Sequence, residues 1–262
     1  MNIKLIGLDI AKSIFHLVAV NQAGKQVLKK LLRRAQLSNY FAKLPPCLIV
    51  MEACGSANYW ARVFTSHGHE VKLIAPQYVK PFVRGNKNDF NDALAITVAA
   101  QVDRMSFVPV KTVDQQDMQM LHRMRSRCIK NRTALCNQIR GLLAEYGITV
   151  TLGVHSVRKQ LPLILEDGGN ELTITAREYF SQLYDELIQI NESLAYHDTK
   201  IVNLNKRHDE CQRLMEISGI GPITATALYA AVGQAKEFKN GRHLSAWLGL
   251  VPGQHSTGGK SN

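Results

Sequence analysis

The sequence predicts an α/β domain at its N-terminal end, followed by a long helical arm and a small, mostly helical domain. Early in the chain, short apolar runs bounded by turn residues alternate with helical stretches, as in an α/β fold. From residue 113 onward, apolar residues recur at the spacing of helical turns over far longer stretches. Near residue 213 the pattern changes again, to short helices joined by glycines. We therefore expect three domains, over residues 1–110, 111–212 and 213–262.

The first domain should open with three strands, over residues 3–10, 14–20 and 25–32. The connections between them are too short for anything but hairpins, so these strands form an antiparallel meander. The pattern then predicts a helix over 36–44, a strand over 47–52, a helix over 57–67, a strand over 71–74 and a helical stretch from Pro76. The resulting order of strands and helices is that of the ribonuclease H-like fold.

Two long helices are expected in the arm, over residues 113–147 and 176–204. The polar, glycine-bearing stretch 166–170 separates them, which predicts an antiparallel coiled coil. The first helix is strongly basic, and a solvated helix face is the alternative to a nucleic-acid contact. The residues expected to contact nucleic acid are Arg123, Arg125, Arg127, Lys130 and Arg132.

The charge of the chain favours a polyanionic partner. Lysine and arginine number 32 against 21 acidic residues, a formal net charge of +11. Nucleic acid fits such a surface best, an anionic membrane surface is a distant second, and a merely soluble basic protein is the alternative. No apolar run approaches the roughly 20 residues of a membrane span, and we expect no signal peptide because the first residues read directly into a strand pattern. The five cysteines share no CxxC spacing and are typical of reduced thiols, so we expect a cytoplasmic protein with no cysteine-bound metal.

Four acidic residues stand where chemistry is expected. Asp9 and Glu52 each end an apolar strand, whereas Asp89 and Asp92 lie three residues apart on one helix face. Converging carboxylates repel one another without a cation, and they suit two Mg²⁺ ions about 3.5–4 Å apart that serve phosphoryl transfer. Taken singly, these acids could instead be strand-end turn formers, a helix N-cap or salt-bridge partners.

Further nucleic-acid contacts are expected near the C-terminal end. Gly219 and Gly221 lie in a turn between two helical segments that resembles a helix-hairpin-helix, where backbone amides can approach a phosphate. A tight structural turn explains the same glycines. Lys260, in the glycine-rich tail, is the last basic residue that we expect to contact nucleic acid.

Four motifs occur in order along the chain: GLDIAK from Gly7, MEACG from Met51, KNDFNDA from Lys87, and SGIGPITATAL from Ser218 with LSAWLGLVPGQHSTGGK after it. Together they resemble the DEDD transposases of bacterial insertion sequences related to the Piv DNA invertase. That family has a RuvC-like N-terminal domain, a coiled-coil arm and a C-terminal transposase domain. The resemblance implies that the DEDD metal-binding tetrad is Asp9, Glu52, Asp89 and Asp92.

The resemblance also implies a serine nucleophile after the Gly-Leu-Val-Pro segment, for which Ser256 is the chosen position and Thr257 the rival. A serine in a flexible, glycine-rich loop is the alternative. Sites shared between protomers of a homo-oligomer, dimer or tetramer, and a noncoding bridge RNA that pairs with DNA are implied in the same way. The family continues with basic helical sequence beyond the point where this chain stops, so we expect a truncated C-terminal domain.

The leading hypothesis is a Mg²⁺-dependent transposase that cleaves and rejoins DNA. A junction-resolving nuclease could use the same tetrad with activated water and without a serine adduct. An actin-like phosphotransferase could begin with a similar strand, but no second glycine-rich phosphate loop follows. A truncated remnant that only binds nucleic acid is the non-enzymatic alternative.

Overall fold

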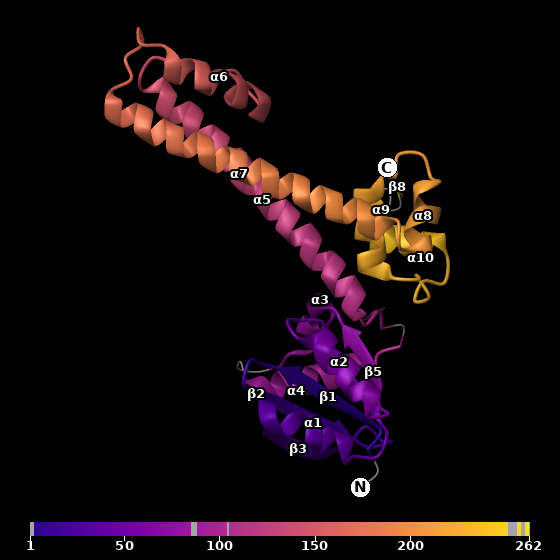
Figure 1. Ribbon diagram of the computed structural model, residues 1–262. Helices are drawn as coiled ribbons and strands as arrows, with labels where there is room; N and C mark the ends of the chain where they lie inside the picture. Colours follow the sequence, from indigo (N-terminus) through magenta and orange to yellow (C-terminus); the bar gives the residue numbers. More distant parts are fainter. Residues whose placement is uncertain (1–2, 85–87, 104, 251–255, 258–259, 262) are drawn as a thin grey trace. The chain divides into compact units, whose positions relative to one another are not determined.

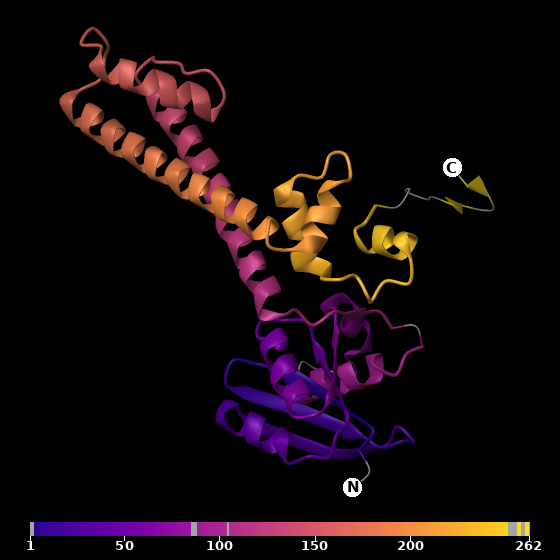
Figure 2. The ribbon, with the colours of Figure 1, turned by 45° about the vertical axis from the view of Figure 1, so that its right-hand side comes forward.

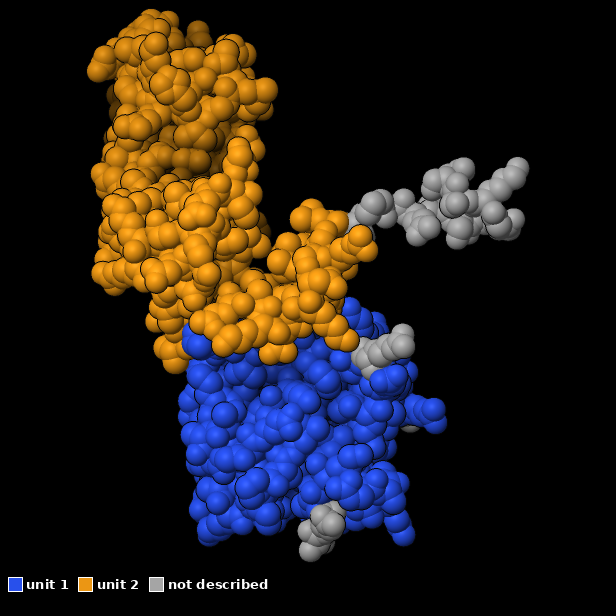
Figure 3. Space-filling model, turned by 90° about the vertical axis from the view of Figure 1, so that its right-hand side faces the viewer, with its two compact units in different colours: residues 1–112 blue, residues 113–262 orange. Residues whose placement is uncertain are grey.

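The computed structural model describes residues 3–84, 88–103, 105–250, 256–257 and 260–261. The chain divides into two compact units, Met1–Thr112 and Val113–Asn262 (Figure 3). Each unit has its own core of buried apolar residues. The further division of unit 2 near residue 213 stays a prediction.

Unit 1 is built on a mixed sheet whose strand order is β3-β2-β1-β4-β5-β6 (Figure 1). The strands are β1 (Leu5–Ile10), β2 (Ile14–Val20), β3 (Gln26–Arg33), β4 (Leu48–Glu52), β5 (Glu70–Ile74) and β6 (Phe107–Val108). β1, β4 and β5 run parallel, while β2, β3 and β6 pair antiparallel with their neighbours. The predicted meander and the two strands after it are confirmed, whereas β6 was not predicted.

Helices cover both faces of this sheet. They are α1 (Arg34–Ala42), α2 (Ala57–Ser66), α3 (Pro76–Val79), the 3₁₀ turn η1 (Lys80–Phe82) and α4 (Asp89–Ala99). Alternate residues of a strand point to opposite faces, so Leu8 and Ile49 pack with Trp60 of α2 on one side. On the other side Val50 packs with Ile96 of α4. A mixed sheet between helical layers is the ribonuclease H-like arrangement that the element order predicted.

Helix α4 lies directly on strand β1 at Gly7. A Cβ atom at this position would lie 2.5 Å from the carbonyl oxygen of Ala93 and 2.8 Å from the amide nitrogen of Thr97. The Thr97 hydroxyl is buried in this contact and donates to the Ala93 carbonyl over 2.8 Å. Only glycine therefore allows the helix to sit at its present distance from the strand.

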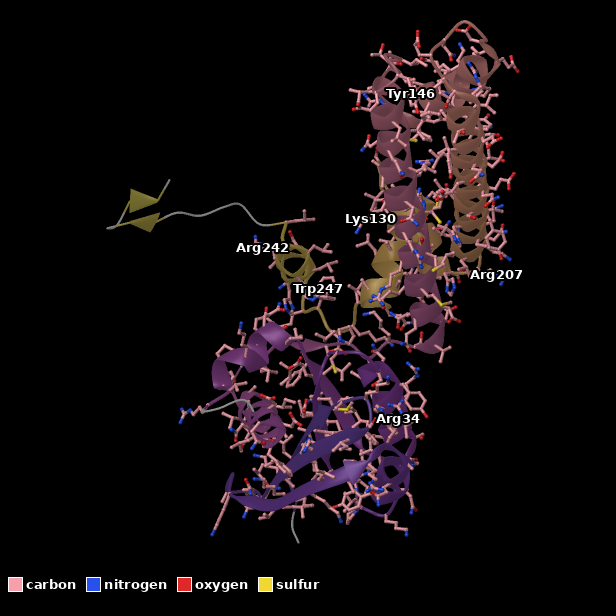
Figure 4. All side chains as sticks on the ribbon, turned by 90° about the vertical axis from the view of Figure 1, so that its left-hand side faces the viewer. Arg34, Lys130, Tyr146, Arg207, Arg242 and Trp247 are labelled. Atoms are coloured by element: carbon pink, nitrogen blue, oxygen red, sulfur yellow. The ribbon has the colours of Figure 1, made fainter. Side chains whose placement is uncertain are left out.

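Unit 2 begins with three helices, α5 (Val113–Ala144), α6 (Val154–Glu166) and α7 (Ile174–Asn205). α5 and α7 run antiparallel along each other (Figure 2), since Arg125 pairs with Asp198 while Arg132 pairs with Asn191. Tyr146 lies at one end of this helical hairpin and Arg207 lies at the opposite end (Figure 4). The predicted antiparallel pair of long helices is confirmed.

Helix α6 lies between the two long helices in the sequence and was not predicted. α6 packs Val157 and Leu161 into the same core as Phe180 of α7. The stretch 166–170 therefore connects α6 to α7. Arg177 ties this connection down by donating to the carbonyl oxygens of Leu165 over 2.7 Å and Asp167 over 2.8 Å.

Three short helices and a two-stranded hairpin complete unit 2: α8 (Asp209–Met215), α9 (Pro222–Val232), α10 (Gly241–Trp247), β7 (Ser256–Thr257) and β8 (Lys260–Ser261). Gly219 has a φ of +88°, which an L side chain rarely adopts, in the turn between α8 and α9. Gly221 is the N-cap of α9, and Pro222 occupies the first turn of that helix. Across the described part of the chain, no helix combines the length and the apolarity that a membrane span needs.

Replacing Gly7 by Ala should lower the free energy of unfolding by about 2–3 kcal/mol, because the added methyl group forces α4 away from β1. Urea unfolding followed by circular dichroism measures the loss. Gly55→Ala is the matched control, since a Cβ atom there meets nothing within 4 Å. A Gly7→Ala protein as stable as wild type would show that the contact between α4 and β1 is not the constraint described above.

Candidate metal centre

Two acidic residues reach the same edge of the sheet from neighbouring parallel strands. β1 and β4 are in register up to the pair Leu8 and Met51, and Asp9 and Glu52 are the next residues on each strand. Asp9 shares a face with Leu5, and Glu52 shares a face with Val50, because side chains alternate along a strand. Leu5 and Val50 belong to the core beneath α4, so both acids lie on the face that α4 covers.

The N-terminal turn of α4 brings two more acids to this edge. Asn88 caps the helix, with its side chain accepting a hydrogen bond from the amide of Phe90 over 2.9 Å. Asp89 and Asp92 both lie in the first turn, and Asp89 is therefore not the N-cap that was considered as an alternative. Acidic side chains are favourable there because the unpaired amides give that end of the helix a partial positive charge.

Three of the four predicted ligands converge. Asp9, Asp89 and Asp92 each offer a carboxylate oxygen, and these oxygens all lie within 4.8 Å of one another. Glu52 lies outside this set, but the charge of Asp92 acts on it. The structure therefore places Glu52 beside a cluster formed by the three aspartates.

Burial and repulsion between like charges shift the pKa values of two of these four acids. Burial, followed by the charges of Asp92 and Asp89, raises the pKa of Asp9 to about 6. Burial and the charge of Asp92 also raise the pKa of Glu52. Carboxylate oxygens gathered in this way are the donor set that Mg²⁺ prefers, and a bound cation would remove the repulsion. The residues present thus fit a divalent metal.

His16 is a neighbour of the cluster that sequence reasoning missed. It pairs with Asp9 across β1 and β2, and its Nδ1 lies 3.5 Å from a carboxylate oxygen of Asp89. The ring is buried and packs edge-on against Phe90, with 4.6 Å between the ring centroids. Nδ1 has no hydrogen-bond partner among the described residues. The register of the first hairpin would have revealed this residue, since it places His16 directly opposite Asp9.

The other predicted site residues stand in unit 2. The backbone of Ser256, Thr257 and Lys260 forms the β7–β8 hairpin. The side chains of these residues lie outside what the structure describes, so their roles as nucleophile, rival nucleophile and nucleic-acid contact stay predictions. Gly219 and Gly221 lie in the exposed turn before α9, in the local geometry that the sequence predicted.

The five basic residues predicted on α5 separate into two groups. Arg125 and Arg132 are half-buried, and they bind Asp198 and Asn191 of α7. Arg123, Arg127 and Lys130 are exposed on another side of the helix. None of the five has been tested as a nucleic-acid contact, but the structure gives Arg125 and Arg132 a packing role.

A carboxylate cluster that is consistent with a metal site, at the edge of a ribonuclease H-like sheet, defines the class of the protein as an enzyme of the DEDD type. Comparison with known families then identifies it. A family described as "Transposase" matches residues 6–148, and the "Transposase IS116/IS110/IS902 family" matches residues 211–262. The chain belongs to this family of transposases, which confirms the resemblance carried by the four motifs.

Individual relatives agree with this assignment. The chain is 45% identical to a probable family 20 transposase of Pseudomonas aeruginosa, over 99% of this chain and 77% of the relative. It is 44% identical to the transposase for insertion sequence element IS1111A of Coxiella burnetii, over 99% of this chain and 71% of the relative. It is also 23% identical to the pilin gene-inverting protein of Moraxella bovis, over 80% of this chain and 58% of the relative.

Replacing Asp9 by Asn should stabilise the metal-free protein at pH 7.5 by about 1–2 kcal/mol, because it removes a carboxylate whose ionised form is disfavoured in the folded state. The Asp9 carboxyl group binds its proton more tightly in the folded state than in the unfolded chain, where its pKa is near 3.8. The stabilising effect of the substitution is therefore full above pH 6 and disappears as the pH falls to 4. Urea unfolding across this pH range measures it.

Without metal, Asp9→Asn should be the more stable of the two proteins. Mg²⁺ should reverse this order, because it should stabilise wild type more than the Asp9→Asn protein. The exposed Asp117 of α5 supplies the control, since Asp117→Asn should change neither the pH dependence nor the response to Mg²⁺. Equal stabilisation of wild type and Asp9→Asn by Mg²⁺ would mean that the cluster is not where the metal binds.

Proposed function

We propose that this transposase cleaves and rejoins DNA strands in a Mg²⁺-dependent reaction that moves an insertion sequence, guided by a noncoding RNA and acting as a homo-oligomer. The observation that carries the proposal is the convergence of Asp9, Asp89 and Asp92 within 4.8 Å, beside Glu52. Mg²⁺ bound by these carboxylates would supply charge stabilisation for a phosphoryl group in transfer.

The chain's own residues prepare the site in three ways. Two strands and one helix, which share the core beneath α4, fix the directions of the carboxylates before any ligand binds. The buried ring of His16 lies beside Asp89, with its Nδ1 3.5 Å from a carboxylate oxygen, and shields one side of that carboxylate from solvent. The raised pKa of Asp9 means that this group loses its proton readily only once a cation is present or the pH exceeds about 6.

We propose Ser256 as the nucleophile. Its hydroxyl oxygen would form a bond to a DNA phosphorus, and the bond from that phosphorus to a deoxyribose oxygen would break. The serine proton would pass to a base, and the released deoxyribose oxygen would take up a proton. Attack by a deoxyribose hydroxyl on the serine phosphodiester would then reverse these bond changes and free the enzyme. The support for this role is the family motif that ends in His255-Ser-Thr-Gly-Gly.

We also infer a finer assignment of the fold. Unit 1 corresponds to a RuvC-like catalytic domain, and the hairpin of α5 and α7 to a coiled-coil arm. The turn between α8 and α9 is proposed to act as a helix-hairpin-helix, in which Gly219 and Gly221 let backbone amides approach a phosphate. The net charge of +11 supports contact with nucleic acid in general, and the guide RNA and the oligomer rest on the family resemblance.

A covalent adduct tests the serine mechanism. Incubation of the wild-type protein with Mg²⁺, the RNA transcribed beside the element and element-end DNA should give a protease-sensitive band of reduced mobility. The adduct should disappear in Ser256→Ala because the attacking oxygen is gone, and in Asp9→Asn because the metal site is weakened. Ser261→Ala is the matched control and should form the adduct as wild type does.

Each other outcome selects a different account. An adduct that persists in Ser256→Ala and is lost in Thr257→Ala would move the nucleophile to Thr257. Cleavage without any adduct would favour a junction-resolving nuclease that uses water. Binding of RNA and DNA without cleavage would mean that the chain is a binding protein only.

A further inference from the structure

A groove in unit 2 lies between helices α5 and α9. It has a volume of about 570 Å³ and is open to solvent. Its lining from α5 consists of residues spaced three or four apart, from Gln119 to Asn131, which places them all on one face of that helix. The opposite wall is formed by alanines of α9, Ala227, Ala230 and Ala231.

The charge of this groove has one sign. Arg123, Arg127 and Lys130 line it, and none of the described residues in its lining is acidic. Neutral hydrogen-bonding side chains, among them Ser126 and Asn131, stand between these cations. The cations are exposed, and Lys130 extends from the side of α5 turned away from α7 (Figure 4).

The groove is held in shape by contacts between its two walls. The Nε2 of His122 lies 3.0 Å from the hydroxyl oxygen of Thr226, which in turn donates to the carbonyl oxygen of Pro222 over 2.6 Å. The hydroxyl proton is thus used within α9, so His122 is the donor in the contact between the helices. Gln115 adds a second link by donating to the carbonyl oxygen of Tyr229 over 3.0 Å. These hydrogen bonds hold α5 and α9 together, so the backbone that carries the three cations has a fixed position relative to α9.

The division of the basic residues of α5 supports a ligand in this groove. Arg125 and Arg132 bind partners on α7, as a structural role requires. Arg123, Arg127 and Lys130 converge instead on an open space beside small side chains, where a bulky backbone can approach. From Gln119 to Asn131 the row extends about 18 Å at 1.5 Å per residue, which spans several phosphates of a strand that rises about 3.4 Å per nucleotide.

We propose that the groove between α5 and α9 binds the phosphodiester backbone of a nucleic acid strand, with Arg123, Arg127 and Lys130 as its phosphate contacts. Cations interleaved with neutral donors are typical of backbone contacts, which position a strand without reading its sequence. This inference rests on the proposed function, for which it supplies a place where the guide RNA or the DNA is held. Both share the same backbone chemistry.

Binding of labelled strands to the full-length chain in EDTA tests the proposal, with fluorescence anisotropy as the readout. The triple variant Arg123→Gln, Arg127→Gln, Lys130→Gln should bind about 100-fold more weakly near 0.15 M salt. The slope of log affinity against log salt should fall by about 3, one for each phosphate contact that is lost. Single-stranded RNA and duplex DNA serve as separate probes, and the probe whose binding suffers more identifies the strand that the groove holds.

The matched control removes the same charge elsewhere. Lys200→Gln, Lys206→Gln, Arg207→Gln changes three exposed cations that do not line the groove, and it should keep the wild-type salt slope. A second variant, Arg123→Lys, Arg127→Lys, should retain most of the affinity if charge in the groove is what matters. Circular dichroism shows whether the triple groove variant keeps its helices.

Equal losses in the groove variant and in the control would overturn the proposal, and so would unchanged binding in the groove variant. Because no metal is present, these results do not depend on cleavage or on Ser256. A failure of the groove would leave the adduct experiment untouched, while failure of the serine mechanism would leave the binding data as they stand.

Discussion

The contact between helix α4 and strand β1 at Gly7 is the constraint on which the site depends. The helix backbone occupies the space where any side chain of residue 7 would lie, and its N-terminal turn therefore reaches the edge of the sheet at Asp9. Without this close approach, Asp89 and Asp92 would stand on a helix some distance from the strands. The hydroxyl of Thr97 is buried in this contact, where its hydrogen bond to the Ala93 carbonyl fixes the orientation of the side chain. The position of Asp89 and Asp92 beside Asp9 thus depends on the lack of a side chain at Gly7.

The packing of the rest of unit 1 offsets the cost of holding these acidic residues close together. Burial and the like charges held close to one another raise the pKa of Asp9, and the two apolar layers on either side of the sheet supply the stabilisation that opposes this cost. The N-terminus of α4 partly offsets the repulsion through its unpaired amides. A fold with this balance gains stability when a cation binds, so that metal binding and site order are linked.

Much of this arrangement follows from local sequence. Apolar runs that end in Asp9 and Glu52 predict acids at the edge of the sheet, and the spacing of Asp89 and Asp92 predicts their common helix face. Features that depend on contacts between residues far apart in the sequence cannot be predicted from local sequence patterns. His16 is recognisable only through its register with Asp9, and α6 contains Pro162, an apparent helix breaker that tertiary packing overrides. The division of the α5 arginines likewise depends on where α7 and α9 lie.

The most direct test is to locate the metal. Crystals of the protein soaked in Mn²⁺ would show its position by anomalous scattering, independently of any activity. The account predicts a peak bound by carboxylate oxygens of Asp9, Asp89 and Asp92, with Glu52 in the same site or next to it. A Mn²⁺ peak bound elsewhere, with these four carboxylates separated and uncoordinated, would contradict the claim that the packing of α4 on β1 assembles a metal centre.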